Sequence, residues 1–152
     1  MKKVKDFMTK EVVTVTRSTP ILEAMKIFSE HHYGGLPVVD EENRILGIVT
    51  KKELLMMFIP DYFDLLGDLS YIEDFGLLKA EVLPELNQLL VIDDIMIRKP
   101  VTATEDMPLL AAASVMAHHH LNILPVVRDD KVVGIISQMD ICRAVYRVEK
   151  KK

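Results

Sequence analysis

The stretch Leu36-Pro37-Val38-Val39, followed by Gly47-Ile48-Val49-Thr50-Lys51-Lys52-Glu53, occurs a second time as Leu124-Pro125-Val126-Val127, followed by Gly134-Ile135-Ile136-Ser137-Gln138-Met139-Asp140. The two copies are offset by 88 residues at Leu36 and by 87 residues at Gly47. Aligned from Val4 to Leu54, 16 of 50 residue pairs are identical. One deletion accounts for the shift, and because identity that recurs at a nearly constant offset marks an internal repeat, the chain contains a duplicated unit.

Each copy carries the signals of the same series of elements. In the first copy, residues 12–16 are β-branched and predict a strand, and Ser18-Thr19-Pro20 predicts a helix start with a hydroxyl cap and proline in the first turn. Gly34-Gly35 predicts the end of that helix. Residues 36–39 and 45–49 predict two short strands before a second helix. The order β-α-β-β-α, present twice, predicts an α/β (α+β) fold.

One copy of this size is too small to bury its own sheet, so we expect the two copies to pack sheet to sheet as one unit. The segment 59–91 between them has no counterpart in the repeat. It holds seven acids and one lysine, and its apolar spacing predicts short helices. The sequence therefore divides into a first repeat (1–58), an acidic helical spacer (59–91) and a second repeat with a basic C-terminal tail (92–152). The spacer is expected to act as a lid on the clefts between the copies, and a partner surface is the alternative.

The composition bounds the class of protein. Of 152 residues, 49% are hydrophobic and 28% are charged, which is typical of a folded chain. The single cysteine, Cys142, and an N-terminus without an apolar run predict a cytoplasmic location. A net charge of −4 argues against nucleic acid as a partner. Residues 107–127 lack Asp, Glu, Lys and Arg but contain three histidines and two prolines, so no membrane span is expected.

The Ser137–Asp140 spacing has its own chemistry. A strand that ends at a hydroxyl, with a carboxylate three residues on in the first helical turn, places two acceptors beside free backbone N–H groups. Such a corner can hold a ribose through the carboxylate and an anion through the helix start. The alternative is that Ser137 and Asp140 only cap their helix. The matching pair Thr50 and Glu53 in the first copy favours the binding role.

These motifs resemble a tandem pair of CBS domains, known as a Bateman module. The resemblance covers the chain outside residues 59–91. It implies two repeats with their sheets in contact, a disc-shaped dimer, and adenosine-containing ligands in the clefts between repeats. We also expect a homodimer because the second helix of each copy offers an additional apolar stripe, formed by Leu54, Leu55, Phe58, Ile141, Ala144 and Val145.

The resemblance implies two clefts, each combining the hydroxyl and acid of one copy with the other copy's first strand, helix start and residues before the proline. The main cleft would be formed by Val12, Val13, Thr19, Ala24, Tyr33, Gly34, Pro37, Ser137 and Asp140. The second cleft would be formed by Thr50, Glu53, Pro100, Val101, Ala112, Leu121, Asn122 and Pro125. It departs from the family pattern because Glu53 replaces the usual aspartate and Met107 replaces a helix-start hydroxyl. We therefore expect one occupied cleft, or two of unequal affinity.

The ligand class follows from a second departure. Family members that hold several phosphates often carry His or Arg just before the Leu-Pro, where this chain has Gly34-Gly35 and Asn122-Ile123. AMP, ADP or S-adenosylmethionine is therefore expected over a tightly held ATP. No other cofactor is implied. Lys51 and Lys52 could contribute, although exposed lysines at a helix start more often face solvent.

Other reactive side chains have simpler interpretations. His31-His32 and His118-His119-His120 could suggest a metal, but adjacent helical positions do not converge, so surface or cap roles are expected. Cys142 is expected to be a buried structural thiol, and no catalytic set appears, which argues against an enzyme.

Two functional classes remain. The first is a sensor that binds an adenosine ligand and signals to a separate partner protein in trans. The second is a ligand-free dimerisation scaffold. Asp140 favours the first class and Glu53 favours the second.

Overall fold

The structure is a computed structural model that describes residues 1–57 and 90–150. The spacer prediction falls on residues outside this part, apart from Leu90 and Val91. The first copy contains a 3-10 helix η1 (Val4–Asp6), α1 (Ile21–Glu30), β1 (Gly35–Val39), β2 (Ile45–Thr50) and α2 (Lys51–Met56). The second contains η2 (Ile92–Asp94), β3 (Ile97–Arg98), β4 (Ala103–Thr104), α5 (Leu109–His119), β5 (Ile123–Arg128), β6 (Lys131–Ser137) and α6 (Gln138–Lys150).

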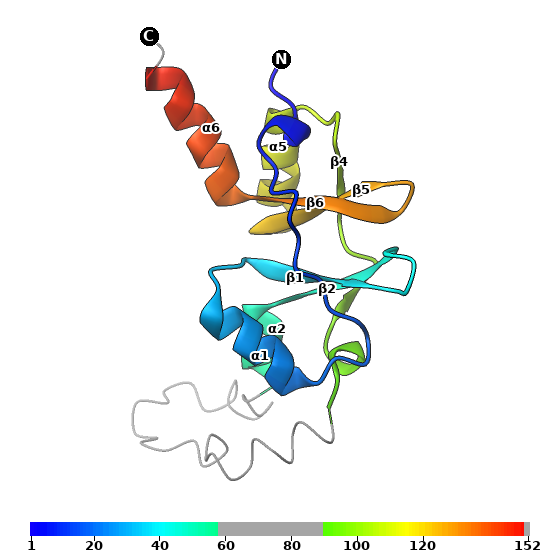
Figure 1. Ribbon diagram of the computed structural model, residues 1–152. Helices are drawn as coiled ribbons and strands as arrows, with labels where there is room; N and C mark the ends of the chain where they lie inside the picture. Colours follow the sequence, from blue (N-terminus) through cyan, green and yellow to red (C-terminus); the bar gives the residue numbers. More distant parts are fainter. Residues whose placement is uncertain (58–89, 151–152) are drawn as a thin grey trace, which may run out of the picture.

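Two three-stranded sheets lie face to face between two layers of helices (Figure 1). One sheet has the order β1-β2-β3 and the other β4-β5-β6. Every residue of β1 is buried, because Leu36 and Val38 point into the core of their own copy. Side chains alternate along a strand, so Pro37 and Val39 cover the opposite face, toward the second sheet. The predicted α/β fold with two repeats packed sheet to sheet is confirmed.

The hairpin tips bind the two sheets to each other. Asn43 Nδ2 donates to the carbonyl of Val132 (2.8 Å), and the Val132 N–H donates to the carbonyl of Asn43 (3.1 Å). The Ile45 N–H donates to the carbonyl of Asp130 (2.8 Å). Asn43 adopts a left-handed backbone (φ 64°), which asparagine tolerates better than most residues. The turn between β1 and β2 therefore fixes how the copies meet.

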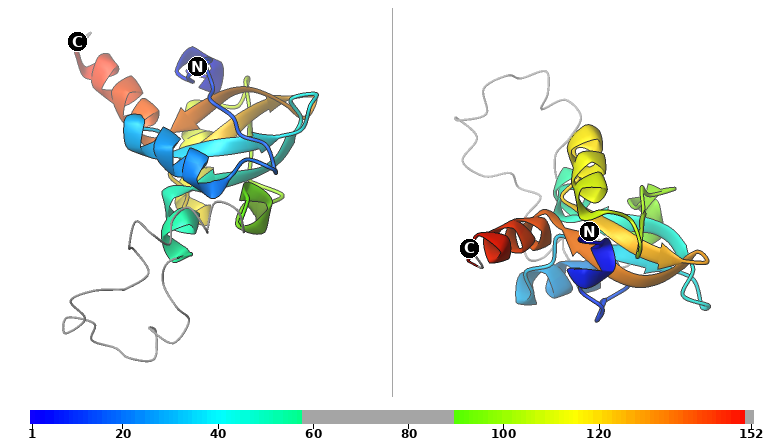
Figure 2. Two further views of the ribbon diagram at one scale, coloured as in Figure 1. Left: turned by 60° about the horizontal axis from the view of Figure 1, so that its bottom comes forward. Right: turned by 90° about the horizontal axis from the view of Figure 1, so that it is seen from above.

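The segment before each copy packs on the other copy. Val4 is fully buried in the core of the second copy, while Ile92 and Met96 are buried in the core of the first. Thr9 pairs with Ile135 of β6, and β3 pairs with β2. The N-terminal segment runs across the second sheet before it enters the first copy (Figures 1 and 2). Each core is therefore built from both halves of the chain.

The repeated glycines Gly47 and Gly134 are explained by this exchange. A Cβ atom at Gly47 would lie 2.6 Å from the carbonyl oxygen of Ile97, and one at Gly134 would lie 2.6 Å from Sδ of Met8. The segment that precedes each copy therefore packs directly on the backbone of a glycine in the other copy. Any larger residue would displace that segment.

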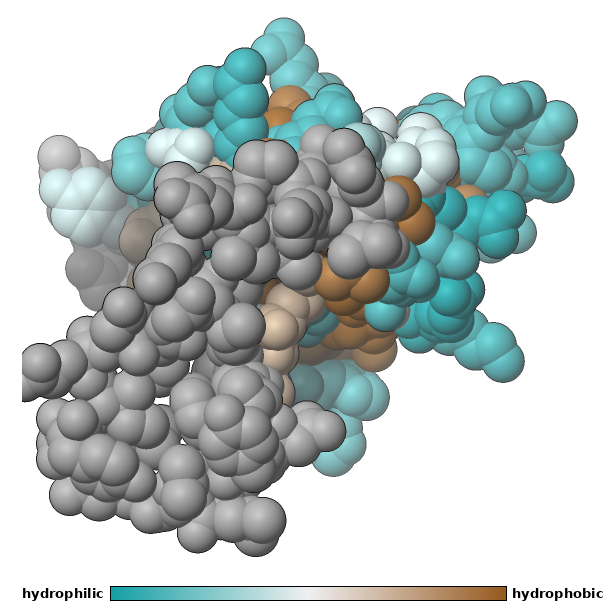
Figure 3. Space-filling view, turned by 90° about the horizontal axis from the view of Figure 1, so that it is seen from below, coloured by the Kyte–Doolittle hydropathy of each residue, from teal (hydrophilic) through white to brown (hydrophobic). Residues whose placement is uncertain are grey.

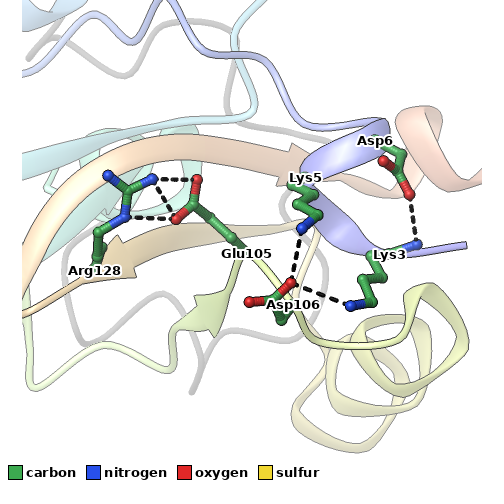
Figure 4. A network of polar contacts seen from close by, with 6 residues as sticks. All are labelled: Lys3, Lys5, Asp6, Glu105, Asp106 and Arg128. Carbon is green, nitrogen blue, oxygen red and sulfur yellow. Dashed lines mark hydrogen bonds and ion pairs between the residues drawn. The ribbon is translucent and has the colours of Figure 1, made fainter.

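An exposed ion-pair network also holds the N-terminal segment on the second copy (Figure 4). Nζ of Lys5 and Nζ of Lys3 contact Oδ1 of Asp106 at 2.9 and 3.2 Å. The hydrogen bond from Lys5, followed by that from Lys3, holds the pKa of Asp106 below its usual value. Nearby, Arg128 forms two hydrogen bonds to Glu105, both of 2.7 Å. The two lysines thus connect η1 to the turn before α5, and Arg128 connects the end of β5 to the same turn.

The first strand of each copy is shorter than predicted. Instead of a strand over residues 12–16, the first copy has a single parallel bridge between Val15 and Val38, and the second has only β4. The Thr19 N–H donates to the carbonyl of Thr16 (3.2 Å), and the Thr16 N–H donates to Oγ1 of Thr19 (3.0 Å), so the chain turns directly after the bridge. Residues 12–14, before the bridge, form no strand because they cross between the sheets, from the pairing of Thr9 with Ile135 to that of Val15 with Val38.

Three local predictions were wrong. The Thr19 hydroxyl does not cap α1, since it is bound to Thr16, and Pro20 itself is the N-cap. The helix α1 ends at Glu30 because His31 is already extended, so Gly34 does not end it. Cys142 is exposed rather than buried, because Asp140 and Ala144 are the α6 residues that face the interior.

Across residues 1–57 and 90–150, none of the helices is both long and apolar enough to cross a bilayer.

Candidate functional site

The corner predicted from Ser137 and Asp140 is formed where β6 runs into α6. The Ser137 N–H and Oγ donate to Oδ2 of Asp140 at 2.8 and 2.9 Å, and the Asp140 N–H donates to Oγ of Ser137 at 3.2 Å. Asp140 is only 9% exposed and is the one buried charged residue in the described part of the chain. Both partners therefore cap α6, and the capping alternative is realised in the structure.

Capping uses only one oxygen of the Asp140 carboxylate. Oδ2 accepts the bonds from Ser137, whereas Oδ1 has a charged neighbour, Nη1 of Arg143, at 3.6 Å. That separation is longer than a charge-assisted hydrogen bond, so Oδ1 retains capacity as an acceptor. Capping and ligand binding are therefore compatible roles for Asp140.

A cavity of about 600 Å³ opens beside this corner, between the two copies. Its wall contains six of the nine residues expected for the main cleft, namely Val12, Val13, Tyr33, Gly34, Ser137 and Asp140. The first four come from the segments before and after α1, and the last two come from the second copy. The cavity therefore has the composition expected of a site shared between repeats.

The other three expected residues do not line this cavity. Thr19 lies in the turn with Thr16, where its hydroxyl accepts a backbone hydrogen bond. The side chain of Ala24 is fully buried in the core of the first copy, and Pro37 is buried within β1. Their places in the main cleft stay predictions from the family pattern.

Several cavity residues were missed by the sequence interpretation. The remaining lining residues are Thr9, Glu11, His32, Gly35, Ile123, Ile135, Met139 and Arg143. Arg143 could have been found, because it lies three residues after Asp140 on α6, and residues three apart are neighbours on a helix surface; Met139 lies four residues before Arg143 on the same helix. Thr9 and Glu11 could not have been found, because they reach the cavity only where the N-terminal segment passes over the second copy. The wall thus carries two acids, Glu11 and Asp140, and two bases, His32 and Arg143.

The floor of the cavity is formed by close contact between the copies. A Cβ atom at Gly34 would lie 2.5 Å from Cγ2 of Ile123, and one at Gly35 would lie 3.0 Å from Cδ1 of the same side chain. Beside them, the rings of Tyr33 and His31 stack with centroids 4.9 Å apart. Glycine at 34 and 35 therefore allows Ile123 to reach the first copy at the base of the cavity.

The corner of the second cleft has the same geometry but different surroundings. The Thr50 N–H and hydroxyl both donate to Oε2 of Glu53, the first over 2.6 Å. On the facing side, the carbonyls of Leu121 and Asn122 accept hydrogen bonds from Gln138, at 3.0 and 2.9 Å. Of the other expected residues, Ala112 and Pro125 are buried, whereas Pro100 and Val101 are partly exposed, as is Met107 at the helix start. The second cleft stays a prediction.

The histidines occupy different places. His32 lines the main cavity, His31 stacks on Tyr33, and the rings of His118 and His119 meet edge to face with centroids 5.1 Å apart. Within the described ranges, no three His, Cys, Asp or Glu side chains converge as a metal ion would require.

The family follows from comparison of the whole chain with known proteins. The family model described as CBS domain matches twice, over residues 4–59 and 92–147. The chain belongs to the CBS-domain family. The two matched ranges contain both Leu-Pro-Val-Val motifs and both helix-start corners. The duplicated motifs therefore identified the family correctly.

Solved CBS-pair structures share the fold and include ligand complexes. The CBSX2 protein of Arabidopsis thaliana in complex with AMP is 25% identical, with a TM-score of 0.74, and the match covers 98% of this chain and 99% of that chain. The CBS domain pair of protein MJ0100, in complex with 5′-methylthioadenosine and S-adenosyl-L-methionine, is 28% identical, with a TM-score of 0.72 and coverages of 97% and 98%. Both of these CBS pairs thus bind adenosine-containing ligands.

Curated relatives include both whole proteins and parts of enzymes. The L-aspartate semialdehyde sulfurtransferase of Methanocaldococcus jannaschii is 30% identical over 141 residues, which are 92% of this chain but only 22% of the enzyme. An uncharacterized protein of the same organism is 26% identical over 93% of this chain and 90% of its own length. CBS pairs are generally regulatory rather than catalytic, and this chain spans about a fifth of the sulfurtransferase.

Proposed function

We propose that this CBS pair binds an adenosine-containing ligand in the main cavity and signals its occupancy to a separate partner protein. The proposal rests on the fact that residues of both copies form the wall of the main cavity. Ser137 and Asp140 of the second copy face the same cavity as Val12, Tyr33 and Gly34 of the first. AMP, ADP, ATP and S-adenosylmethionine are the candidate ligands, and the complexes of CBSX2 and MJ0100 support this class.

The wall offers each part of such a ligand a suitable partner. Oδ1 of Asp140 can accept from ribose hydroxyls while Oδ2 continues to cap α6. Val12, Ile123 and Ile135 provide apolar surface for the adenine ring. A volume of about 600 Å³ lies within the usual range of small-molecule sites. The cavity therefore fits one nucleoside ligand in size and chemistry.

Regulation follows from the position of the cavity between the copies. A ligand that contacts both copies binds more tightly to the arrangement that presents both walls, and so favours that arrangement over others. A partner that contacts surfaces of both copies would then sense whether the cavity is occupied. In the sulfurtransferase relative the similar region is part of a longer chain, whereas we propose that here the partner is a separate protein.

The proposed homodimer requires apolar surface outside the two cores. Two residues of the predicted stripe, Leu54 and Ala144, do not supply it, because they are buried inside the chain, and Phe58 lies outside the described residues. Leu55 and Val145 remain 63% and 53% exposed. Viewed from below, apolar surface borders the grey residues (Figure 3), on the side of the molecule where α2 lies (Figure 1). We propose that these faces associate in a dimer.

Calorimetric titration with AMP, ADP, ATP and S-adenosylmethionine tests the ligand proposal, with thermal melting as a second readout. We expect saturable binding of at least one ligand and a higher melting temperature in its presence. Hydrogen exchange at β1 and β5, which meet at the floor, should slow in the same sample. If all four ligands fail at millimolar concentration while the chain is a dimer by light scattering, the ligand-free scaffold is the correct function.

A further inference from the structure

Arg143 is the charged side chain closest to the proposed ribose-binding carboxylate. It lines the main cavity and also a smaller neighbouring cavity of about 260 Å³, which it shares with Arg147, Asp6 and Asp140. Its side chain is 65% exposed. The guanidinium therefore lies at the mouth of the main cavity, where a ligand and solvent can both reach it.

The guanidinium retains most of its hydrogen-bonding capacity. Among the described residues its one ion-pair partner is Oδ1 of Asp140, at 3.6 Å. Arginine carries five N–H donors in a planar fork that matches the oxygens of a phosphate or a carboxylate. Because its contact with Asp140 is long, the Arg143 guanidinium can donate hydrogen bonds to a second anion without breaking a strong hydrogen bond.

The first copy lacks this group. The residue three positions after Glu53, which corresponds to Arg143, is Met56, and it is 54% exposed. The two corners are otherwise alike, since both combine a hydroxyl with an acid at a helix start. The repeats therefore differ in whether a cation stands beside the acid.

We propose that Arg143 binds the anionic group joined to the 5′ side of the adenosine ligand, and so selects charged ligands over adenosine and 5′-methylthioadenosine. The proposal rests on the proposed function and names the ligand class of the same cavity. The anion is either the phosphate of AMP or the carboxylate of S-adenosylmethionine. Glu11, which also lines the cavity, can distinguish the two ligands. Only S-adenosylmethionine carries an ammonium group that the Glu11 carboxylate could bind.

The test compares wild type with Arg143→Met, which installs the residue of the first copy. We expect AMP affinity to fall about tenfold or more, as for a lost charged hydrogen bond, while adenosine affinity stays unchanged. The salt dependence of AMP binding should also weaken. Arg147→Met is the matched control, because Arg147 lies on α6 beside the smaller cavity but does not line the main one, and it should leave both affinities unchanged.

A Glu11→Gln variant identifies the source of the anion. If S-adenosylmethionine is the ligand, its affinity falls in both Arg143→Met and Glu11→Gln; if AMP is the ligand, only Arg143→Met weakens binding. Equal losses for adenosine and AMP in Arg143→Met, or no loss for any charged ligand, would overturn the role of Arg143 and leave the proposed function intact. Failure of every adenosine compound to bind wild type would overturn both.

Discussion

Ile123 lies against Gly34 so closely that a Cβ atom on the glycine would be 2.5 Å from Cγ2 of the isoleucine. The two residues come from different copies and meet at the floor of the main cavity. Cγ2 is attached directly to Cβ, so it cannot swing away as the end of a long side chain could. The separation of the two sheets at this point is set by the absence of one methyl group.

Gly34→Ala should therefore destabilise the protein by about 1–3 kcal/mol, the usual cost of overpacking. Urea denaturation measures the effect. Gly34→Ala combined with Ile123→Ala removes the obstructing methyl and should recover part of the overpacking loss relative to Ile123→Ala alone. A single Gly34→Ala variant with unchanged stability would show that the copies can separate at no cost.

Asp140→Ala should weaken adenosine-ligand binding by about 1.5–3 kcal/mol, since it removes a charged acceptor. It should also cost about 1 kcal/mol of stability, because the same carboxylate caps α6. Glu53→Ala is the matched control, as it removes the corresponding cap of α2. Calorimetry and denaturation together separate the effects, and equal losses of affinity in the two variants would contradict our ranking of the clefts.

Asn43→Gly should destabilise the pair by about 1 kcal/mol, because it removes the side-chain hydrogen bond to Val132 but keeps the left-handed backbone. Asn43→Ala should cost about 1–2 kcal/mol more, since alanine disfavours that conformation. Thermal and urea unfolding report both values. If Asn43→Gly and Asn43→Ala are equally stable, the left-handed turn is not maintained in solution.

Asp106 should make stability depend on pH in the acid range. Its pKa is lowered in the folded protein by Lys5 and then Lys3, so its contribution is present above the unfolded pKa of about 3.9 and is lost as the pH falls through the lower folded value. Melting temperatures of wild type and Asp106→Asn should differ at pH 7 and converge as the pH falls below the unfolded pKa and through the lower folded pKa. The difference should shrink in high salt, because the network is exposed. A difference that stays constant throughout the acid range would rule out this linkage.

The duplication and the hydrophobic pattern were sufficient to predict the two repeats, the central strands and the corner at Ser137 and Asp140. These features depend on residues close together in the chain, where spacing translates directly into geometry. The first strand was predicted too long because its β-branched residues favour extension, whereas residues 12–14 cross from the second sheet at Ile135 to the first at Val38 and form no strand.

The rest of the site depends on contacts between distant segments. Thr9 and Glu11 line the cavity only because the N-terminal segment pairs with β6 before it enters its own copy. Cys142 was expected to be a buried structural thiol because no histidine lies near it in the sequence, but on α6 it is Asp140 and Ala144 that are buried. Spacing along one helix could have revealed Arg143, but it could not reveal which helix face borders a cavity.

The exchange of segments between the copies also bears on synthesis at the ribosome. The core of the first copy contains Ile92 and Met96, which are translated long after the strands and helices that surround them. The first copy therefore cannot complete its core as it emerges, even though domains generally fold as units during translation. Its sheet must wait for the opening residues of the second copy. A truncated product that ends in the spacer would expose apolar surface, which makes it a substrate for chaperones and proteases.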